Sequence, residues 1–538
     1  MTSRLEPMPG RMSAQRWTHR ASRVHAFMIR PNTMIENEKL LIASTSLLSR
    51  TYARTRTLTP APKHGAVLSA AALAVALLSG CAAGPDYVRP QLDAPAAFKE
   101  SGPWKSAQPQ QVDSQHPWWT LYGDATLDTL MVQANQANQN IALAQAQYRQ
   151  ASALAEAAHA GFFPTAGVTA SGGRARSNSS GVKVGDPLTL GLTASWEPDL
   201  WGSVRRAVEA GDFASQASAA DLAAARLSVQ AALAQAYFQL RTTDAQAALY
   251  QRTVDGYRKA LALVQHQQEA GVALRSDVAL AQTQLESADA QRIELQLQRA
   301  QLEHALAVLL GQPPSSFGLA PRDEPMALVP ATPAGVPSEL LERRPDVAAA
   351  ERRAAQANAN IGVARAAYFP MIILSGADGR ASAGLTNLFS APARVWSLGA
   401  ALAGTLFDGG LRQAQDARAM AAYDGAVAQY RQTVLLGFQE VEDNLAALRV
   451  LSAESVVQER AVQAAQLSER LALSQYRAGT VNYLAVVTAQ ALALTNQRAA
   501  VQLLGRQLSA SVTLVKATGG GWNTHEENSA KLAQNPLN

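Results

Sequence analysis

The side chains that most often carry catalysis or bind metals are sparse in this sequence and stand at no spacing typical of a site. Cys81 is the only cysteine among 538 residues, so no disulfide can form within the chain. Five histidines follow it, and no two of them have the spacing of a zinc site: His116, His159, His266, His304 and His525. The sequence has no glycine-rich phosphate loop, no Gly-x-Ser-x-Gly and no His-Glu-x-x-His. We expect no catalytic residue, no metal and no enzyme, with the histidines solvated or facing a tunnel.

Cys81 is instead placed for covalent modification. The 13-residue apolar run Ala66–Leu78 follows several basic side chains and precedes the small residues Ser79 and Gly80. This arrangement is typical of a signal peptide, and the run is too short to span ~30 Å of hydrocarbon. Leu-Ser-Gly-Cys resembles a bacterial lipobox, which implies cleavage before Cys81 and acylation of its sulfur and amine. We therefore expect residues 1–80 to be a leader and Cys81 to carry a covalent lipid, such as palmitate.

Two neighbouring features bear on this leader. Ala82 follows the cysteine where an aspartate would stand in other lipoproteins, and this resembles an outer-membrane address. The stretch before the apolar run is long, so Met28 and Met34 are candidates for the true start. An ordinary secretory peptide with an incidental cysteine is the alternative.

The basic charge of the sequence is concentrated in the leader. Residues 1–80 hold 11 of the 47 Lys and Arg and 3 of the 42 Asp and Glu, a net charge of +8. The rest of the chain holds the other 36 basic and 39 acidic residues, a net charge of −3. This balance gives no support to nucleic-acid binding by the body of the protein.

Two glycines, Gly271 and Gly479, are expected where long helices reverse direction, because such turns need a positive φ. Before the first turn, apolar or small residues from Leu233 to Val264 repeat in steps of three and four, which is typical of a coiled-coil seam. A helix over 203–270 would be roughly 100 Å long at ~1.5 Å per residue, so it must lie against other helices. A return helix is expected to about residue 310.

Other segments alternate with the period of a β-strand. Leu188, Leu190, Leu192, Ala194 and Trp196 alternate with polar or small residues, and residues 165–171 do so more weakly. A Gly-, Ser- and Asn-rich loop is expected over 172–185. Further along, a strand-like run follows Pro370, and a second runs from Trp396 to Leu406. The sequence therefore predicts four strands.

These elements occur twice in the same order. Pro164 and Pro370 both end a helix after an aromatic residue, Asp199 and Asp408 both precede a long helix, and Gly271 and Gly479 both mark a turn. These pairs lie 206, 209 and 208 residues apart. The near-constant offset predicts an internal duplication. We place the first repeat at about 125–310, the second at about 345–518 and a polar tail at 519–538, all within one body over 81–538.

Four strands with lipid-facing side chains cannot close a barrel alone, and open sheet edges do not occur in hydrocarbon. The helical seams also need partners, and the many alanines allow helices to approach closely. The sequence therefore predicts an oligomer with a strand barrel at one end and a helical tube at the other.

Several motifs, by their order and spacing, resemble the TolC-type outer-membrane factors, and more closely the NodT branch of outer-membrane efflux lipoproteins. They are the lipobox, Gly84-Pro85-Asp86-Tyr87-Val88-Arg89-Pro90, Glu342-Arg343-Arg344-Pro345-Asp346-Val347, Asn360–Pro370, Leu406-Phe407-Asp408-Gly409-Gly410 and Tyr476-Arg477-Ala478-Gly479-Thr480. The resemblance covers about Cys81–Thr518. It implies a mainly α fold with a small β part, in which long antiparallel helical hairpins form an α-barrel and each subunit of a homotrimer gives four strands to a transmembrane β-barrel.

The same resemblance implies the function. The protein would be the outer-membrane exit duct of a tripartite efflux pump, lipid-anchored and extending into the periplasm. It would passively conduct drugs or other small toxic compounds handed on by a periplasmic membrane-fusion adaptor and an inner-membrane pump of the resistance-nodulation-division (RND) type. No cofactor is implied beyond the lipid on Cys81.

The resemblance also places the two turns at the periplasmic tip, where the adaptor docks and the channel is gated. The implied docking residues are Gly271, Val272, Arg275, Ser276, Asp277, Gly479, Thr480, Asn482 and Tyr483. The implied gate residues are Tyr476, Arg477, Ala485 and Thr488. The alternative is that the charges near the turns are only solvated helix ends.

Ala485 and Thr488 depart from the family pattern. Relatives often carry an acidic residue at one or both positions, and a ring of carboxylates attracts cations. Without that ring we expect weak selectivity for cations and weak block by divalent cations, unless Asp277 supplies the carboxylates.

Two other functions are compatible with the residues. One is the exit duct of a type I protein secretion system, although the lipobox and the Gly-Pro-Asp-Tyr motif favour efflux. The other is a structural periplasmic coiled-coil lipoprotein without a pore, although such a spacer has no use for four alternating strands.

Overall fold

The computed structural model describes residues 83–92, 95, 97–100, 117–177, 183–322, 329–330 and 343–521. All of them lie within one compact unit, Ser69–Asn538. The predicted leader, Cys81 and the tail beyond Gly521 lie outside the described residues.

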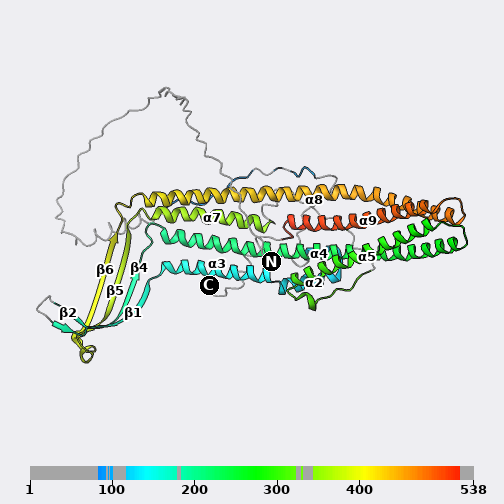
Figure 1. The fold of residues 1–538 in the computed structure, drawn as a ribbon. Helices are drawn as coiled ribbons and strands as arrows, with labels where there is room; N and C mark the ends of the chain where they lie inside the picture. Colours follow the sequence, from blue (N-terminus) through cyan, green and yellow to red (C-terminus); the bar gives the residue numbers. More distant parts are fainter. Residues whose placement is uncertain are drawn as a thin grey trace, which may run out of the picture. The chain divides into compact units, whose positions relative to one another are not determined.

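Most of the described residues are helical. The α-helices are α2 (Ala125–Ala137), α3 (Gln139–His159), α4 (Ser203–Glu269), α5 (Arg275–Leu309), α7 (Pro345–Ala366), α8 (Leu411–Arg477) and α9 (Tyr483–Ala517). Short 3₁₀ helices are η1 (Trp118–Tyr122), η2 (Ala160–Phe162), η3 (Pro314–Ser316), η4 (Leu385–Asn387) and η5 (Ala391–Ala393). Helix α4 packs against α3, α5, α7 and α9, and α8 packs against α7 and α9 (Figure 1). The predicted long helices and return helices are confirmed.

The α4 seam is buried as its spacing predicts. Leu233, Leu240, Val254 and Val264 all lie in the interior. The largest apolar cluster joins this helix to η1, α2 and the end of α9, and it includes Tyr237. Burial of this stripe, rather than the propensity of single residues, fixes so long a helix.

The residues over 125–160 have the sequence pattern of one helix, but the chain forms two, α2 and α3. The chain breaks at Asn138, whose backbone is extended with ψ 127°. The Asn138 side chain accepts hydrogen bonds from the amides of Asn140 and Ile141 and so begins α3. It also donates to the Leu309 carbonyl at 2.7 Å, so a tertiary contact favours the break.

The strands are β1 (Thr165–Gly172), β2 (Ala175–Ser177), β3 (Lys183–Gly185), β4 (Leu188–Trp196), β5 (Met371–Ser382) and β6 (Arg394–Ala403). Four of them form an antiparallel sheet in the order β1-β4-β5-β6, beside the ends of α3, α4, α7 and α8 (Figure 1). Strand β6 begins two residues before Trp396 and ends before Leu406, unlike the predicted run. The region expected to be only a loop contains the β2–β3 ribbon.

The two faces of the main sheet differ. The register places Leu192, Asp378 and Trp396 in one cross-strand row, and Leu374 lies opposite Trp196 on the same face. The opposite face carries two rows of small residues: Gly167, Thr193, Ala377 and Ser397, then Thr165, Ser195, Ser375 and Gly399. The apolar side chains are exposed, with Leu398 at 84% of its full accessibility. The predicted alternation is therefore confirmed, and none of the described residues covers these apolar side chains.

Candidate functional site

The two predicted turns have the same backbone geometry. Gly271 adopts φ 76° and Gly479 adopts φ 74°. Each following amide closes the turn on a helix carbonyl: Val272 N donates to Gln267 O at 2.8 Å, and Thr480 N donates to Gln475 O at 3.0 Å. This pattern ends a helix on a left-handed residue, which glycine adopts without steric cost.

Polar side chains then begin each return helix. Asp277 accepts a hydrogen bond from the Leu274 amide at 3.1 Å. Asn482 accepts one from the Ala485 amide at 3.2 Å. Both bonds engage amides at the start of a helix, where the carbonyl four residues earlier is not part of the helix. These two predicted docking residues therefore stabilise the starts of the return helices.

An apolar cluster brings the two turns together. It contains Val264 from α4, Ala281 from α5, Tyr476 from α8, and Tyr483 and Val486 from α9. The Tyr476 and Tyr483 rings lie 5.3 Å apart at 59°. Tyr476 was predicted as a gate residue and Tyr483 as a docking residue, and both are buried, at 8% and 2% exposure. In this position they act through packing between the two turns.

Burial also sets the ionisation of these tyrosines. It raises the pKa of Tyr483 to about 12, with smaller effects from Tyr476, Tyr257 and Asp277. Burial, and then the Asp277 carboxylate, raise the pKa of Tyr476. Both phenols are therefore neutral at physiological pH, and the cluster carries no charge of its own.

The outer surface of the turns is mixed in chemistry. Val272 and Leu274 are strongly exposed. Gly271, Arg275, Ser276, Arg477, Gly479, Thr480 and Asn482 are also exposed, and Asp277 is half-buried. Ala485 is half-buried, while the Thr488 hydroxyl is exposed and donates to Leu484 O at 2.9 Å. The structure thus gathers the predicted residues around one paired turn, with apolar and cationic groups outermost.

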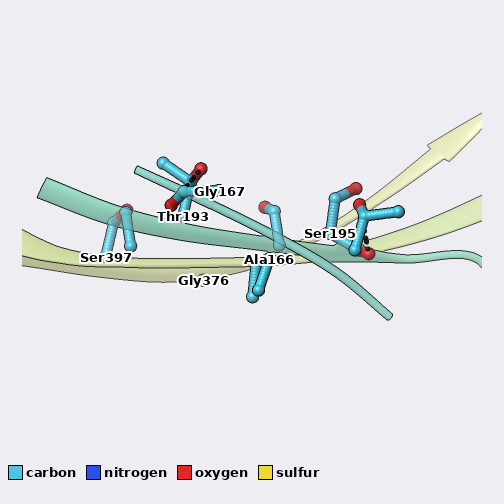
Figure 2. A pocket seen from close by; sticks show the side chains of 10 residues that line it. Ala166, Gly167, Thr193, Ser195, Gly376 and Ser397 are labelled. Carbon is cyan, nitrogen blue, oxygen red and sulfur yellow. Dashed lines mark hydrogen bonds between the residues drawn. The ribbon is translucent and has the colours of Figure 1, made fainter. Parts of the chain in front are cut away.

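Little in the described part of the chain suggests catalysis. No cluster of three or more His, Cys, Asp or Glu side chains that could hold a metal occurs among the described residues. His159 and His266 lie near Asp212 and Glu269 on exposed helix surfaces. A shallow pocket of about 390 Å³ lies on the small-residue face of the sheet, where the labelled side chains are short and uncharged (Figure 2). Its lining holds hydroxyl side chains but no charged group, and no histidine or carboxylate to activate a hydroxyl.

Among the described helices, none is both long enough and apolar enough to cross a membrane.

Sequence reasoning missed how the Gly-Pro-Asp-Tyr motif is held. The buried Arg206 guanidinium donates to Asp86 at 2.7 Å and to the Ala83 carbonyl at 3.2 Å. The Tyr87 hydroxyl donates to Glu351 at 2.6 Å, and burial raises its pKa. The motif therefore joins α4 to α7. Its partners lie more than a hundred residues away, so no local pattern could have identified them.

Arg344, in a second quoted motif, is likewise a buried junction. It donates to Asp346 and Glu440, each at 2.7 Å, and to the Ala517 carbonyl at 3.1 Å. These bonds connect the start of α7, the middle of α8 and the end of α9. Its role is structural rather than chemical.

Comparisons with known proteins point to one class. A family model described as outer membrane efflux protein matches residues 130–312 and 336–520. The pyoverdine export outer membrane protein OpmQ of Pseudomonas aeruginosa is 31% identical over 465 residues, 85% of this chain and 97% of OpmQ. The outer membrane protein OprJ of the same organism is 33% identical over 461 residues, 84% of this chain and 95% of OprJ. The solved outer-membrane channel OprN superposes with a TM-score of 0.77 at 32% identity, covering 82% of this chain and all of OprN's.

Proposed function

The chain belongs to the outer membrane efflux protein family, and from that premise we propose that three copies of it form the exit duct of a tripartite efflux pump. As an efflux protein of the outer membrane it is not an enzyme, in agreement with the sequence analysis. The duct passively conducts small toxic compounds that a periplasmic adaptor and an inner-membrane RND-type pump deliver. OpmQ is a relative whose name states pyoverdine export, which supports a small-molecule cargo.

The observation that carries the proposal is the unfinished sheet. Among the described residues, β1 pairs only with β4 and β6 pairs only with β5, so both outer strands keep a free edge. One face of this sheet is apolar and exposed. Joining β6 of one copy to β1 of the next removes every edge, and three copies give a twelve-stranded barrel with small residues inside.

An internal duplication explains how one chain builds two similar walls. Helices α4 and α8 both have 67 residues, and α5 and α9 both have 35. The ends of the return helices are held alike, because Asn138 donates to Leu309 O and Arg344 donates to Ala517 O. The two segments matched by the family model support repeats at about 125–310 and 345–518.

The paired turns are the proposed tip of the duct. Gly271, Val272, Arg275, Ser276 and the Gly479–Asn482 turn form the surface for the adaptor, while the buried tyrosines hold the closed gate. The exposed Val272 and Leu274 support docking, since an isolated solvated turn gains nothing from apolar side chains at its apex.

A lipid on Cys81 is the proposed anchor, and the described chain nearby supports it. The Ala83 amide donates to Trp201 O at 3.0 Å, where β4 leads into α4. Two residues of extended chain span at most about 7 Å, so a lipid two residues earlier would enter the bilayer beside this helix–strand junction.

Replacing Cys81 with serine is expected to abolish incorporation of labelled palmitate. The chain has no other thiol that could accept it. Wild-type and Cys81→Ser proteins should be compared at equal expression. Equal labelling of the two would contradict the lipid anchor and leave the duct itself untouched.

Planar-bilayer recordings test the duct and its closed tip together. The purified protein is expected to run as a heat-modifiable trimer and to give stepwise conductance; a monomer without conductance would exclude the channel.

Divalent cations added on the periplasmic side should block wild type weakly, because Ala485 and Thr488 supply no carboxylate ring. Thr488→Asp should introduce strong block. Strong block of wild type that persists in Asp277→Asn would contradict this reading of the tip.

A further inference from the structure

Two arginines lie directly opposite each other on the apolar face of the sheet. The register pairs Arg380 of β5 with Arg394 of β6, and Leu190 of β4 lies in the same row. Like charges directly opposite each other on neighbouring strands repel. This pair stands at the end of the sheet farthest from the helices, beside the connection between β5 and β6.

Neighbouring groups hold both arginines but leave donors free to bind. Arg394 Nε lies 3.1 Å from Asp378 Oδ1, and both side chains are more than half exposed. Arg380 Nη1 donates to Ser390 O at 3.0 Å, and the guanidinium lies 5.9 Å from the Phe389 ring centroid. Each guanidinium has five N–H donors, and the contacts above engage one donor of each among the described residues. Arg380, Arg394 and Asp378, which stands in the neighbouring row, together carry a net charge of +1.

The row also lies at the border of an apolar band. On the same face, toward the helices, Trp396, Leu398 and Leu402 are 73%, 84% and 69% exposed. Arg394 and Leu402 are separated by roughly 27 Å along the strand, or about 20 Å in height for a strand tilted by ~40°. The apolar band of an outer-membrane protein is ~25 Å tall. The arginines therefore stand where hydrocarbon gives way to lipid headgroups.

We propose that Arg380 and Arg394 bind the phosphate of an anionic lipid headgroup at the helix-distal border of the membrane. Guanidinium groups suit phosphate oxygens because their donors match them in pairs. The bound phosphate relieves the repulsion between the arginines, while Asp378 competes for Arg394 and weakens the site. This inference rests on the proposed function, in which the apolar face of the sheet contacts lipid.

The test measures which lipid surrounds Trp396, two residues from Arg394. The full-length trimer is reconstituted with phosphatidylcholine or phosphatidylglycerol brominated on the acyl chains, and the quenching lost in Trp396→Phe is assigned to Trp396. Wild type is expected to prefer the anionic lipid by about fivefold or more, since each arginine near a membrane surface contributes roughly a fivefold preference. Arg380→Gln/Arg394→Gln should lower the preference to about one, and Asp378→Asn should raise it. Arg252→Gln, on an exposed part of α4, should leave it unchanged.

The outcomes separate this inference from the proposed function. Equal quenching by both lipids in wild type, or an unchanged preference in the double variant, would overturn the headgroup site alone. No quenching of Trp396 by either lipid would overturn both, because the sheet would not face a bilayer. Inorganic phosphate, compared with chloride at equal ionic strength, should change the preference by less than about twofold. Loss of the preference with inorganic phosphate alone would overturn the assignment to lipid.

Discussion

Alanine at Gly519 is expected to destabilise the protein strongly, by about 3 kcal/mol or more in the free energy of unfolding. Gly519 has φ 90°, and a Cβ placed there would fall 1.9 Å from the Arg343 carbonyl oxygen. The left-handed backbone alone costs roughly 1–2 kcal/mol for other residues. The clash with a backbone atom must in addition push the end of α9 away from the start of α7. A fall in the midpoint of thermal unfolding, followed by circular dichroism in detergent, measures the effect.

Gly256→Ala is the matched control. Gly256 lies within α4, and a Cβ added there would meet nothing within 4 Å. Because alanine favours a helix by ~1 kcal/mol over glycine, this variant should be neutral or slightly stabilised. Equal midpoints for Gly519→Ala and Gly256→Ala would show that α9 is not held against Arg343.

Gly311→Ala should repeat the effect of Gly519→Ala in the other half of the chain. Gly311 has φ 69°, and its added Cβ would fall 2.2 Å from the Ala137 carbonyl oxygen. In both halves the chain leaves a return helix through a left-handed glycine, which lies against the second residue before α3 or α7. Similar losses in the free energy of unfolding from both substitutions would support the proposed duplication, because equivalent junctions would then contribute equally to stability.

These junctions mark the limit of what the sequence could predict. The long helices and their turns were predictable because the evidence is local: a seam from Leu233 to Val264, and glycines at Gly271 and Gly479. Gly311 and Gly519 carry no such signal, since each stands where an irregular segment begins. Each glycine is required because a carbonyl remote in sequence, that of Ala137 or Arg343, leaves no room for a Cβ.

The same distinction, between local signals and contacts remote in sequence, applies to the break between α2 and α3 and to the sheet. Asn138 is a good residue to begin a helix, and that signal was available, but the apolar pattern runs on through it. Alternation predicted that β4 and β6 are strands. It could not predict that β4 lies beside β5, because that pairing joins the two halves of the chain. The short β2 and β3 pair only with each other and show no alternation long enough to detect.

At the candidate site, the turns were predictable but the burial of their tyrosines was not. Tyr476 precedes the exposed Arg477, and Tyr483 follows the exposed Asn482, so their neighbours suggest a surface. Only the packing of α8 and α9 against α4 and α5 turns both rings inward.

Tyr483→Ala is expected to open the proposed gate. The Tyr483 ring is 2% exposed, and it packs against Tyr476 in the cluster that joins the two turns. Removing a buried aromatic side chain costs ~3–5 kcal/mol. If about 3 kcal/mol of this loss falls on the closed state and not on the open state, the ratio of open to closed channels rises by about a hundredfold. Single-channel open probability in planar bilayers measures this ratio directly.

Tyr483→Phe and Leu484→Ala separate gating from general damage to the tip. Phenylalanine keeps the ring in the cluster, so its open probability should stay within a few fold of wild type. Leu484 is the next residue on α9 and is 56% exposed, so its truncation removes little packing. An open probability that rises equally in Tyr483→Ala and Leu484→Ala would mean that the buried pair does not hold the tip shut. A rise confined to Tyr483→Ala would place the closing force in the contact between the two helical hairpins, with no need for the charged ring that Ala485 and Thr488 lack.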